Sequence, residues 1–557
     1  MMAQSERDLL PRLEDFPQDQ RNGAVELLLK ICERQREEII ALRKRVETQS
    51  EEIQILREQN ALQAEQIRGL KDEIARLKGE KGRPNIKPSN LNKEVSGGSG
   101  EGQKTRGKPS NKKTHKLKIH HERVLEPQDL PDGSKFKGYK VYIVQDVEIN
   151  LNNTRYLRAR YETPDGHTVI GELPEGVSGS HYGPTLCSYI LNQYYEQHVS
   201  QNLILKQVLE FGILISAGAL NSIIIENKEG FHKEKDEVLK AGLEVSSYVN
   251  VDDTGARHQG KNGYCTHIGN ELFAWFSSTG SKSRINFLEL LRADRTEYVI
   301  DDLAREHMTQ QRMPKAQQKL FAQDRTLADK DSWREHLHQL GLNERCRRIA
   351  TEGALIATIM ERGAFADLVI MSDAAGQFSV TGFLNALCWI HAERNINKII
   401  PFTDDNRQAQ ELVRDQLWCF YQDLKAYKLA PTNTIKTALL RRFDEIFTKK
   451  TCFQTLNLAL QRIYANKKEL LLVLDRPEIP LHNNLSENDI RDYVKKRKIS
   501  ATTRSDAGRK ARDSLLSLKK TCQKLGISFR EYLYDRIASR NIIPPLSEIL
   551  RAKAQSP

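Results

Sequence analysis

The chain has 557 residues, enough for roughly three or four domains, and no apolar run approaches the roughly 20 residues of a membrane span. The first residues lack the basic-then-apolar order of a signal peptide, so a soluble intracellular protein is expected. A formal net charge of +12 favours a polyanionic partner, and eight cysteines without a CxxC pair argue against a disulfide framework or a four-Cys zinc site.

A heptad array between Val25 and Leu77 is the first recognisable element. Mostly branched residues recur at every seventh position, and Leu or Gln fills the companion positions. Asn60 lies in the seam, where an asparagine fixes register at some cost in stability. The pattern predicts an N-terminal coiled-coil dimerisation helix over residues 1–78, and therefore a homodimer. A lone amphipathic helix folded back on the body is the alternative, because three Gln interrupt the seam.

Residues 79–118 predict a flexible basic linker. Between Lys81 and Lys118 eleven Lys or Arg oppose two Glu, among frequent Gly, Pro, Ser and Asn. Such a segment cannot bury enough apolar surface to fold, but it can neutralise phosphates or act as a solubilising tether. Residues 119–182 then show short β-like runs with a Pro-Asp-Gly turn signal, and predict a small β unit.

Residues 183–245 predict helices, two of which join at Gly212. This outline fits a helix-turn-helix, although the second helix carries few side chains that read bases. A structural helical hairpin is the alternative.

Two strand-like runs that end in acids follow. Val249 and Val251 alternate with polar residues before Asp252 and Asp253, and an apolar run near Ile370 ends at Asp373. Residues 301–360 between them predict a helical insertion. The acids suit metal-dependent chemistry, and Asp-Asp-Thr-Gly suits an ordinary turn equally well.

Residues 385–398, NALCWIHAERNINK, contain Cys388 and His391 at the spacing of half a zinc site. No second Cys or His pair lies nearby in sequence, so a closed structural zinc site is not expected. At a strand end beside Asp373, His391 either contacts DNA or orients water; a hydrogen-bonded core histidine is the alternative. Residues 400–478 then predict a second helical insertion.

The segment from Ile479 to Arg512 combines a helix start with a dense run of cations. Glu487 follows Asn484 and Ser486, which are ordinary helix-start residues, so a capped surface helix is one interpretation. A carboxylate flanked by cations is also what metal-dependent chemistry on a phosphodiester requires.

Taken in order, Asp252, Asp373, the CWIHAER stretch and NNLSENDIRDYVKKRKIS resemble the insertion-sequence-66 family of bacterial DDE transposases. The likeness runs from the heptads to near residue 540. It implies an α/β fold: an RNase H-like mixed-sheet core over residues 246–525 with insertions at about 301–360 and 400–478, and a helical tail over 526–557. Many members carry a Cys-rich zinc-binding stretch before the core, which this chain lacks, so no zinc ribbon is expected.

The resemblance implies a site with three carboxylates, Asp252, Asp373 and Glu487, which act as catalytic residues and metal ligands. Asp253 is an alternate first ligand, and Asp301 or Asp302 is a rival second acid. Two Mg²⁺ ions are expected, with Mn²⁺ as an alternative. The residues expected to contact DNA are His391, Arg394, Arg491, Lys495, Lys496, Arg497, Lys498, Arg504 and Arg509.

The function implied is metal-dependent cleavage of element ends and strand transfer into target DNA. The alternatives are an inactive or domesticated dimeric DNA-binding regulator and a structure-selective nuclease on the same core. Expected partners are DNA, a second copy of the chain through the coiled coil, and small accessory transposition proteins, with no membrane. The expected location is the bacterial cytoplasm, at the nucleoid when bound to DNA.

Overall fold

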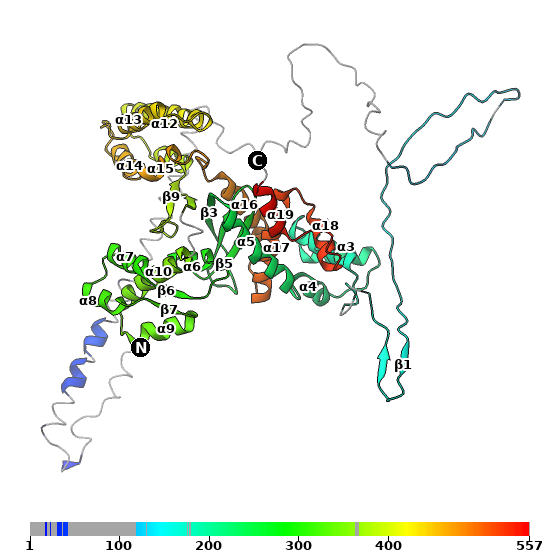
Figure 1. Cartoon of the computed structure of the whole chain (residues 1–557), viewed down its shortest axis with the longest axis horizontal. Helices are drawn as coiled ribbons and strands as arrows, with labels where there is room; N and C mark the ends of the chain where they lie inside the picture. The colour runs from blue at the N-terminus through cyan, green and yellow to red at the C-terminus, as the bar shows by residue number, and fades with distance from the viewer. Residues whose placement is uncertain are drawn as a thin grey trace. The chain divides into compact units, whose positions relative to one another are not determined.

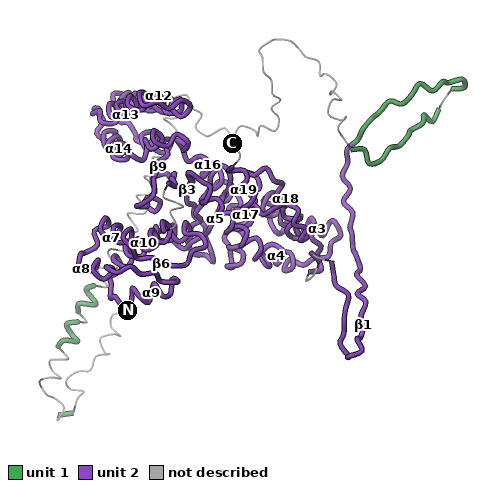
Figure 2. The backbone as a smooth tube through the Cα atoms, viewed as in Figure 1, with its two compact units in different colours: residues 1–144 green, residues 145–557 purple. Residues whose placement is uncertain are grey.

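A computed structural model describes residues 118–555 apart from 130, 175, 178–179 and 362–366, together with scattered positions between 17 and 49. The chain divides into two compact units, residues 1–144 and 145–557 (Figure 2). In the first unit, residues 30–35 and 37–42 are helical, and Ile39 and Leu42 of the heptad seam are exposed. Most of the predicted coiled coil, and the basic linker up to residue 117, lie outside the described residues.

A short antiparallel hairpin lies within the region expected to form a β unit. Strands β1 (Arg160–Glu162) and β2 (Thr168–Ile170) pair with each other, and all six residues are exposed. The Pro-Asp-Gly signal forms the turn, since Gly166 has φ +79° and its amide donates to the Thr163 carbonyl at 2.8 Å. In the described part of residues 119–182 this hairpin is the only β-sheet.

Four helices precede the central sheet. They are α2 (Pro184–Tyr195), α3 (Gln201–Glu210), α4 (Ala217–Ile225) and α5 (Glu229–Val245). Gly212, with φ +83°, allows the chain to turn between α3 and α4. Helix α4 buries Leu220 and Ile224, and none of its residues is Lys or Arg. Its apolar character favours a packing role in the hairpin.

A five-stranded mixed sheet forms the centre of the second unit (Figure 1). Its strands are β3 (Tyr248–Gly255), β4 (Tyr264–Gly269), β5 (Ala274–Thr279), β8 (Val369–Ser372) and β9 (Leu384–Leu387). The spatial order is β5-β4-β3-β8-β9. Strand β4 is antiparallel to both neighbours, and β3, β8 and β9 are parallel. The expected mixed α/β class is therefore confirmed.

The segment between β5 and β8, which contains the insertion expected at residues 301–360, holds strands as well as helices. Its elements are α6 (Arg284–Leu291), β6 (Tyr298–Ile300), α7 (Asp302–Gln310), α8 (Lys315–Gln318), the 3₁₀ turn η5 (Lys319–Phe321), β7 (Arg325–Leu327), α9 (Lys330–Gln339) and α10 (Glu344–Met360). Strands β6 and β7 pair antiparallel. Asp301 caps α7 through the Ala304 amide, and Asp302 pairs with Arg305 at 2.7 Å, so both rival acids have local structural partners.

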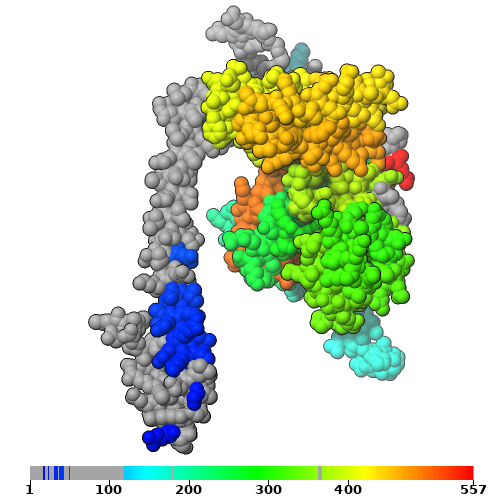
Figure 3. All heavy atoms as spheres, turned by 90° about the vertical axis from the view of Figure 1, so that its left-hand side faces the viewer, coloured from blue at the N-terminus to red at the C-terminus, as the bar shows by residue number. Residues whose placement is uncertain are grey.

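The second insertion forms a body with its own core (Figure 3). Its elements are α11 (Trp389–Asn397), α12 (Asp404–Leu429), α13 (Asn433–Phe447), α14 (Gln454–Ala465), α15 (Lys467–Leu470) and the 3₁₀ turn η6 (Leu472–Leu474). The rings of Phe420 and Phe443 pack on Trp389 with centroid distances of 5.4 and 6.1 Å. Aromatic packing of this kind holds α12 and α13 to α11.

The last four helices enclose the main core. They are α16 (Asn484–Ser500), α17 (Asp506–Leu525), α18 (Phe529–Ile537) and α19 (Leu546–Gln555). Helix α17 lies along β5, where the hydroxyl of Ser517 accepts from the Phe276 amide at 2.8 Å. Helices α18 and α19 bury Tyr532 and Leu550 completely, so the expected C-terminal tail packs into the core. No described helix combines the length and the apolarity that a membrane crossing requires.

Helix α16 is fixed to β3 through Asn483, the residue just before it. Asn483 is fully buried; its Nδ2 donates to the Val251 carbonyl at 2.9 Å, and its Oδ1 accepts from Asn250 Nδ2 at 2.7 Å. The side chain therefore makes no capping hydrogen bond to its own helix. The start of α16 is thus docked on the strand that carries Asp252.

This docking predicts a stability cost for Asn483→Ala. Removal of the amide leaves the Val251 carbonyl and Asn250 amide buried without partners, which costs about 1–3 kcal/mol of the free energy of unfolding. Urea denaturation of the full chain measures the loss. The control is Asn484→Ala, one residue further along and half-buried, which should change the free energy by no more than about 0.5 kcal/mol. Equal losses in the two variants would contradict the docking role.

Candidate active site

Three acids reach the same edge of the sheet from three different elements. Asp252 lies on β3, Asp373 directly follows β8, and Glu487 lies in the first turn of α16. Asn250 is level with Met371 in the parallel pairing of β3 and β8. Continued by two residues, this register sets Asp252 level with Asp373. Asn483 then brings the start of α16 onto the same strand.

The three carboxylates influence one another electrostatically. Burial, opposed by the Asp253 amide that donates to Asp252 at 2.7 Å, raises the pKa of Asp252 to about 7. The negative charges of Asp373, Asp253 and Glu487 add to this rise. Such crowding of carboxylates is typical of sites that bind cations or transfer protons.

Asp253 belongs to the other face of the sheet. Side chains alternate along a strand, so Asp252 and Asp253 point to opposite sides. Asp253 accepts from Thr266 at 2.6 Å through one oxygen and from Gln377 at 2.8 Å through the other. Both carboxylate oxygens therefore already have neutral donors, an arrangement that favours Asp252 as the first ligand.

Two side chains of α11, Arg394 and His391, lie against Glu487. Arg394 donates to both carboxylate oxygens, at 3.0 and 3.4 Å, and His391 Nε2 lies 3.7 Å from Oε1. Arg491, one turn further along α16, lies 3.7 Å from Oε2. The structure thus brings His391 and Arg394, both expected to contact DNA, to the third acid. Burial lowers the pKa of His391, against the opposing charges of Asp373 and Glu487.

Cys388 has a structural environment. Its thiol is buried and accepts from the Asn483 amide at 3.2 Å, and burial raises its pKa. A protonated, buried thiol is a poor metal ligand. Among the described residues, no group of three His, Cys, Asp or Glu side chains is close enough to hold one ion, so the acids are neighbours without forming a closed ligand set.

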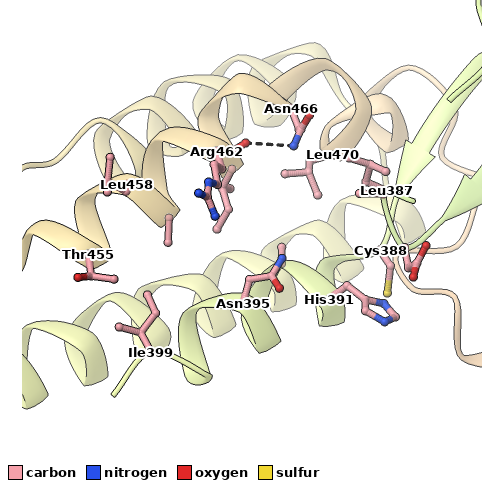
Figure 4. Close-up of a pocket in the computed structure, with 15 residues that line it drawn as sticks. Leu387, Cys388, His391, Asn395, Ile399, Thr455, Leu458, Arg462, Asn466 and Leu470 are labelled. Carbon is pink, nitrogen blue, oxygen red and sulfur yellow. Dashed lines mark hydrogen bonds between the residues drawn. The ribbon is translucent and has the colours of Figure 1, made fainter. Parts of the chain in front are cut away.

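A cavity of about 300 Å³ opens beside Asp373 between α11 and α14 (Figure 4). Figure 4 shows Asn395 of α11 and Arg462 of α14 between the two helices, with Cys388 and His391 at one end. The second insertion therefore supplies a wall of the space next to the second acid.

Of the seven residues of α16 and α17 and the segment between them that were expected to contact phosphates, four are exposed. The other three, Lys496, Arg497 and Arg509, are buried or already have partners within the protein. The exposed residues are Arg491, Lys495, Lys498 and Arg504. Arg497 donates to the Thr254 hydroxyl at 3.2 Å and to the Gly255 carbonyl, and Arg509 pairs with Asp506 at 2.8 Å.

Lys496 departs most from a surface role. Its side chain is 0% exposed, its ammonium nitrogen lies 3.0 Å from the Tyr194 ring centroid, and it donates to the Tyr194 carbonyl. Burial, with the charges of Arg512 and Lys519, lowers its pKa to about 6. A neutral, buried amine is not available to a phosphate, so the expectation for Lys496 is corrected here.

Sequence reasoning missed the polar residues that seat α16. His267 on β4 is level with Asp252; its Nδ1 lies 2.6 Å from the Ser486 hydroxyl and its Nε2 lies 3.2 Å from Asp489. Asn483 was visible as the first residue of NNLSENDIRDYVKKRKIS, but the partners of its side chain lie more than 230 positions upstream.

The fold and the site define a mixed α/β protein with three acids from β3, β8 and α16 at one sheet edge. Residues 352–511 match the model of the transposase IS66 family. Uncharacterized protein y4jO of Sinorhizobium fredii (strain NBRC 101917 / NGR234) is 42% identical over 323 residues, which cover 57% of this chain and 100% of that protein. The chain belongs to the IS66 transposase family. Asp373 and Glu487 lie inside the matched range, and Asp252 lies before it.

The raised pKa of Asp252 predicts that the free energy of unfolding decreases as the pH rises. Between the ordinary value of 3.8 and about 7 the folded protein binds this proton more tightly than the unfolded chain, so stability falls as pH rises through that window. Asp252→Asn removes this titrating group. Without divalent ions, the free energy of unfolding of the variant should therefore rise by about 1–3 kcal/mol relative to that of wild type when the pH is raised from 4 to 7.5. Urea denaturation at both pH values measures the gain; parallel pH profiles would contradict it.

The burial of Lys496 predicts different effects of neighbouring lysines on DNA binding. Lys496→Met should leave the slope of log K against log salt unchanged, because the amine is neutral and enclosed. Lys495→Gln, on the exposed side of α16, should lower the slope by about one. Fluorescence anisotropy with a labelled 30-base-pair duplex measures both; a slope that falls equally in the two variants would show that Lys496 reaches the DNA.

Proposed function

We propose that this protein is a DDE-type DNA transposase that cleaves element ends and joins them to target DNA. The observation that carries the proposal is the placement of Asp252, Asp373 and Glu487 at one edge of the sheet, where burial, and after it the charges of the other acids, raises the pKa of Asp252. A protein that only binds DNA gains nothing from three crowded carboxylates, since they repel phosphate.

The sheet supports an RNase H-like core. Its order, β5-β4-β3-β8-β9, places the first strand in the centre, and β4 alone runs against the others. The first acid lies on the central strand and the second follows its parallel neighbour. The third acid lies in the first turn of α16, and Asn483 attaches the start of this helix to the central strand β3.

The donor set fits a hard divalent cation. Carboxylate oxygens are what Mg²⁺ prefers. Asp252, Asp373 and Glu487 do not converge on one ion among the described residues, and drawn closer together they would hold two such ions, with Mn²⁺ as an alternative. When bound, these ions activate the attacking oxygen and stabilise the leaving oxygen of the phosphodiester. Asp252 must be ionised to serve as a ligand, so its pKa of about 7 makes ion binding compete with a proton.

The chain's own cations position the substrate. Arg394 neutralises Glu487 through a bidentate contact, so a cation bound there competes with the guanidinium for the same oxygens. The exposed residues of the α16 run, including Lys495 and Lys498, provide charge for DNA phosphates beside the acids. Arg497 braces the end of β3 and thereby holds the strand that carries Asp252.

The partners follow from the same proposal. Double-stranded DNA, as element ends and as target, is the substrate, in the cytoplasm of a bacterium and at its nucleoid. A homodimer through the N-terminal heptads brings two ends together, since each active site serves one end. Small accessory transposition proteins complete the expected set.

A joining assay tests the function. Full-length protein with Mg²⁺ or Mn²⁺, labelled DNA from the ends of the element and a target plasmid should give joined products. Glu487→Gln keeps the shape of the side chain but removes its charge, and should reduce joining by at least roughly 100-fold. The control is Glu478→Gln, a half-exposed carboxylate that pairs with Arg476 before α16, which should retain joining.

The products separate the alternatives. Nicks without joined strands would identify a structure-selective nuclease, and binding without any cut would identify an inactive regulator. Joining that persists in Glu487→Gln would remove Glu487 from the site while leaving the transposase function intact.

A further inference from the structure

A second cavity, of about 250 Å³, lies at the far end of β3. Its walls are the β3–β4 turn, the end of β5, and the start of α17, which contributes Arg509 and Arg512. All of these segments lie within the second unit, and none of the three acids lines the cavity.

The turn that forms one wall is firmly built. His258 and Lys261 exchange backbone hydrogen bonds of 3.0 and 2.9 Å, with Gln259 (φ 50°) and Gly260 (φ +76°) between them. Two successive residues with positive φ form the tight hairpin turn that matches strand twist. The Gln259 amide donates to the Thr503 carbonyl at 2.8 Å, which ties the turn to the segment before α17.

The cavity is strongly basic. Five of its lining side chains are cationic or can become so, namely Arg257, His258, Lys261, Arg509 and Arg512. None of the described lining residues is Asp or Glu. The nearest acid in contact with them is Asp506, whose Oδ1 lies 3.2 Å from His258 and 2.8 Å from Arg509. A second carboxylate, Asp513, lies behind the wall: it accepts from the Ser278 amide at 2.8 Å and interacts electrostatically with Arg512.

Arg512 is the most informative member. It is only 6% exposed, yet the hydrogen bond that its guanidinium donates within the described chain goes to a neutral group, the Ala501 carbonyl, at 3.1 Å. Asp513 is the acid that interacts electrostatically with Arg512, but among the described residues no carboxylate forms a salt bridge with this guanidinium, whose planar donor fork matches an anion such as phosphate. The cavity is therefore built to receive a negative group.

The cavity is connected to the acids along one strand. Arg257 follows Asp252 by five residues, so at a strand rise near 3.3 Å the two lie at most roughly 17 Å apart along the chain. Arg497 bonds to Thr254 and Gly255 between them. With a phosphate every 3.4 Å of helix axis on each strand, that span corresponds to at most about five nucleotides.

We propose that this cavity binds a backbone phosphate of the DNA, within about five nucleotides of the phosphodiester that is cleaved beside the three acids. The inference rests on the proposed function for the position of the cleaved bond. The site fixes the register of the duplex relative to Asp252, while the surface cations of α16 supply nonspecific attraction.

The test uses the double variant Arg257→Gln/Lys261→Gln in the full-length chain. Both side chains are exposed at the cavity mouth, so the fold is preserved. In EDTA, with a fluorescein-labelled 30-base-pair duplex, the slope of log K against log salt should fall by about two. The control, Lys449→Gln/Lys450→Gln, removes the same charge from exposed positions after α13 and should leave the slope within about 0.5 of wild type.

A second measurement locates the phosphate. Single methylphosphonates, which are neutral, are introduced one at a time into a duplex that carries the element end. One position should weaken binding of wild type about 10-fold and leave the double variant unaffected. The proposal is overturned if the salt slope of the double variant is unchanged, or if the slope of the control falls equally. It is also overturned if each methylphosphonate weakens the binding of wild type and double variant to the same extent.

Inorganic phosphate separates the two sources of the anion. If millimolar phosphate raises the melting temperature of wild type but not of the variant, while the duplex slopes agree, the cavity takes a free phosphate and the DNA contact is refuted. Every readout is binding without divalent ions. Failure of the joining assay therefore bears on the proposed function alone, and failure of these measurements bears on the cavity alone.

Discussion

The attachment of α16 to β3 and β4 is the contact on which the site depends. Asn483 replaces a helix cap with hydrogen bonds to β3, and the Ser486 hydroxyl lies 2.6 Å from His267 of β4. Because these groups are buried, each contact that is lost leaves an unsatisfied polar atom. The helix start has little freedom to shift along the sheet, so Glu487 stays beside the strand that carries Asp252.

The same helix carries a second, charged layer toward α17. Asp489 lies 2.8 Å from Lys524 Nζ, and Asp492 pairs with Lys519 and lies 3.0 Å from His198 of the segment after α2. Buried ion pairs of this kind add little net stability, because desolvation offsets attraction. They do define one register, since a shift of one turn would leave several charges unpaired. Geometry at the acids is thus specified by polar groups rather than by apolar packing.

Much of this arrangement follows from local patterns, and part of it does not. Asp252 and Asp373 each close a recognisable apolar run, and residues 400–478 predict the helical insertion that contains α12, so strand ends and the insertion are visible in sequence. The partners of the Asn483 side chain lie more than 230 positions away, beyond any local pattern. In sequence, Lys496 does not differ from the other cations of the run KKRK. Its burial follows from helical spacing, because it continues the buried face of α16 formed by Ser486, Asp489 and Tyr493.

The second insertion covers one face of the sheet. Along β8 the side chains alternate between two cores: Ile370 faces the main core, while Val369 and Met371 pack with Trp389 and the insertion helices. Without the insertion, that face of β8 would lie open to water one residue before Asp373. The insertion also positions α11, whose Arg394 holds Glu487. A long segment between the second and third acids is therefore required both to cover the strand that presents one acid and to hold the other in place.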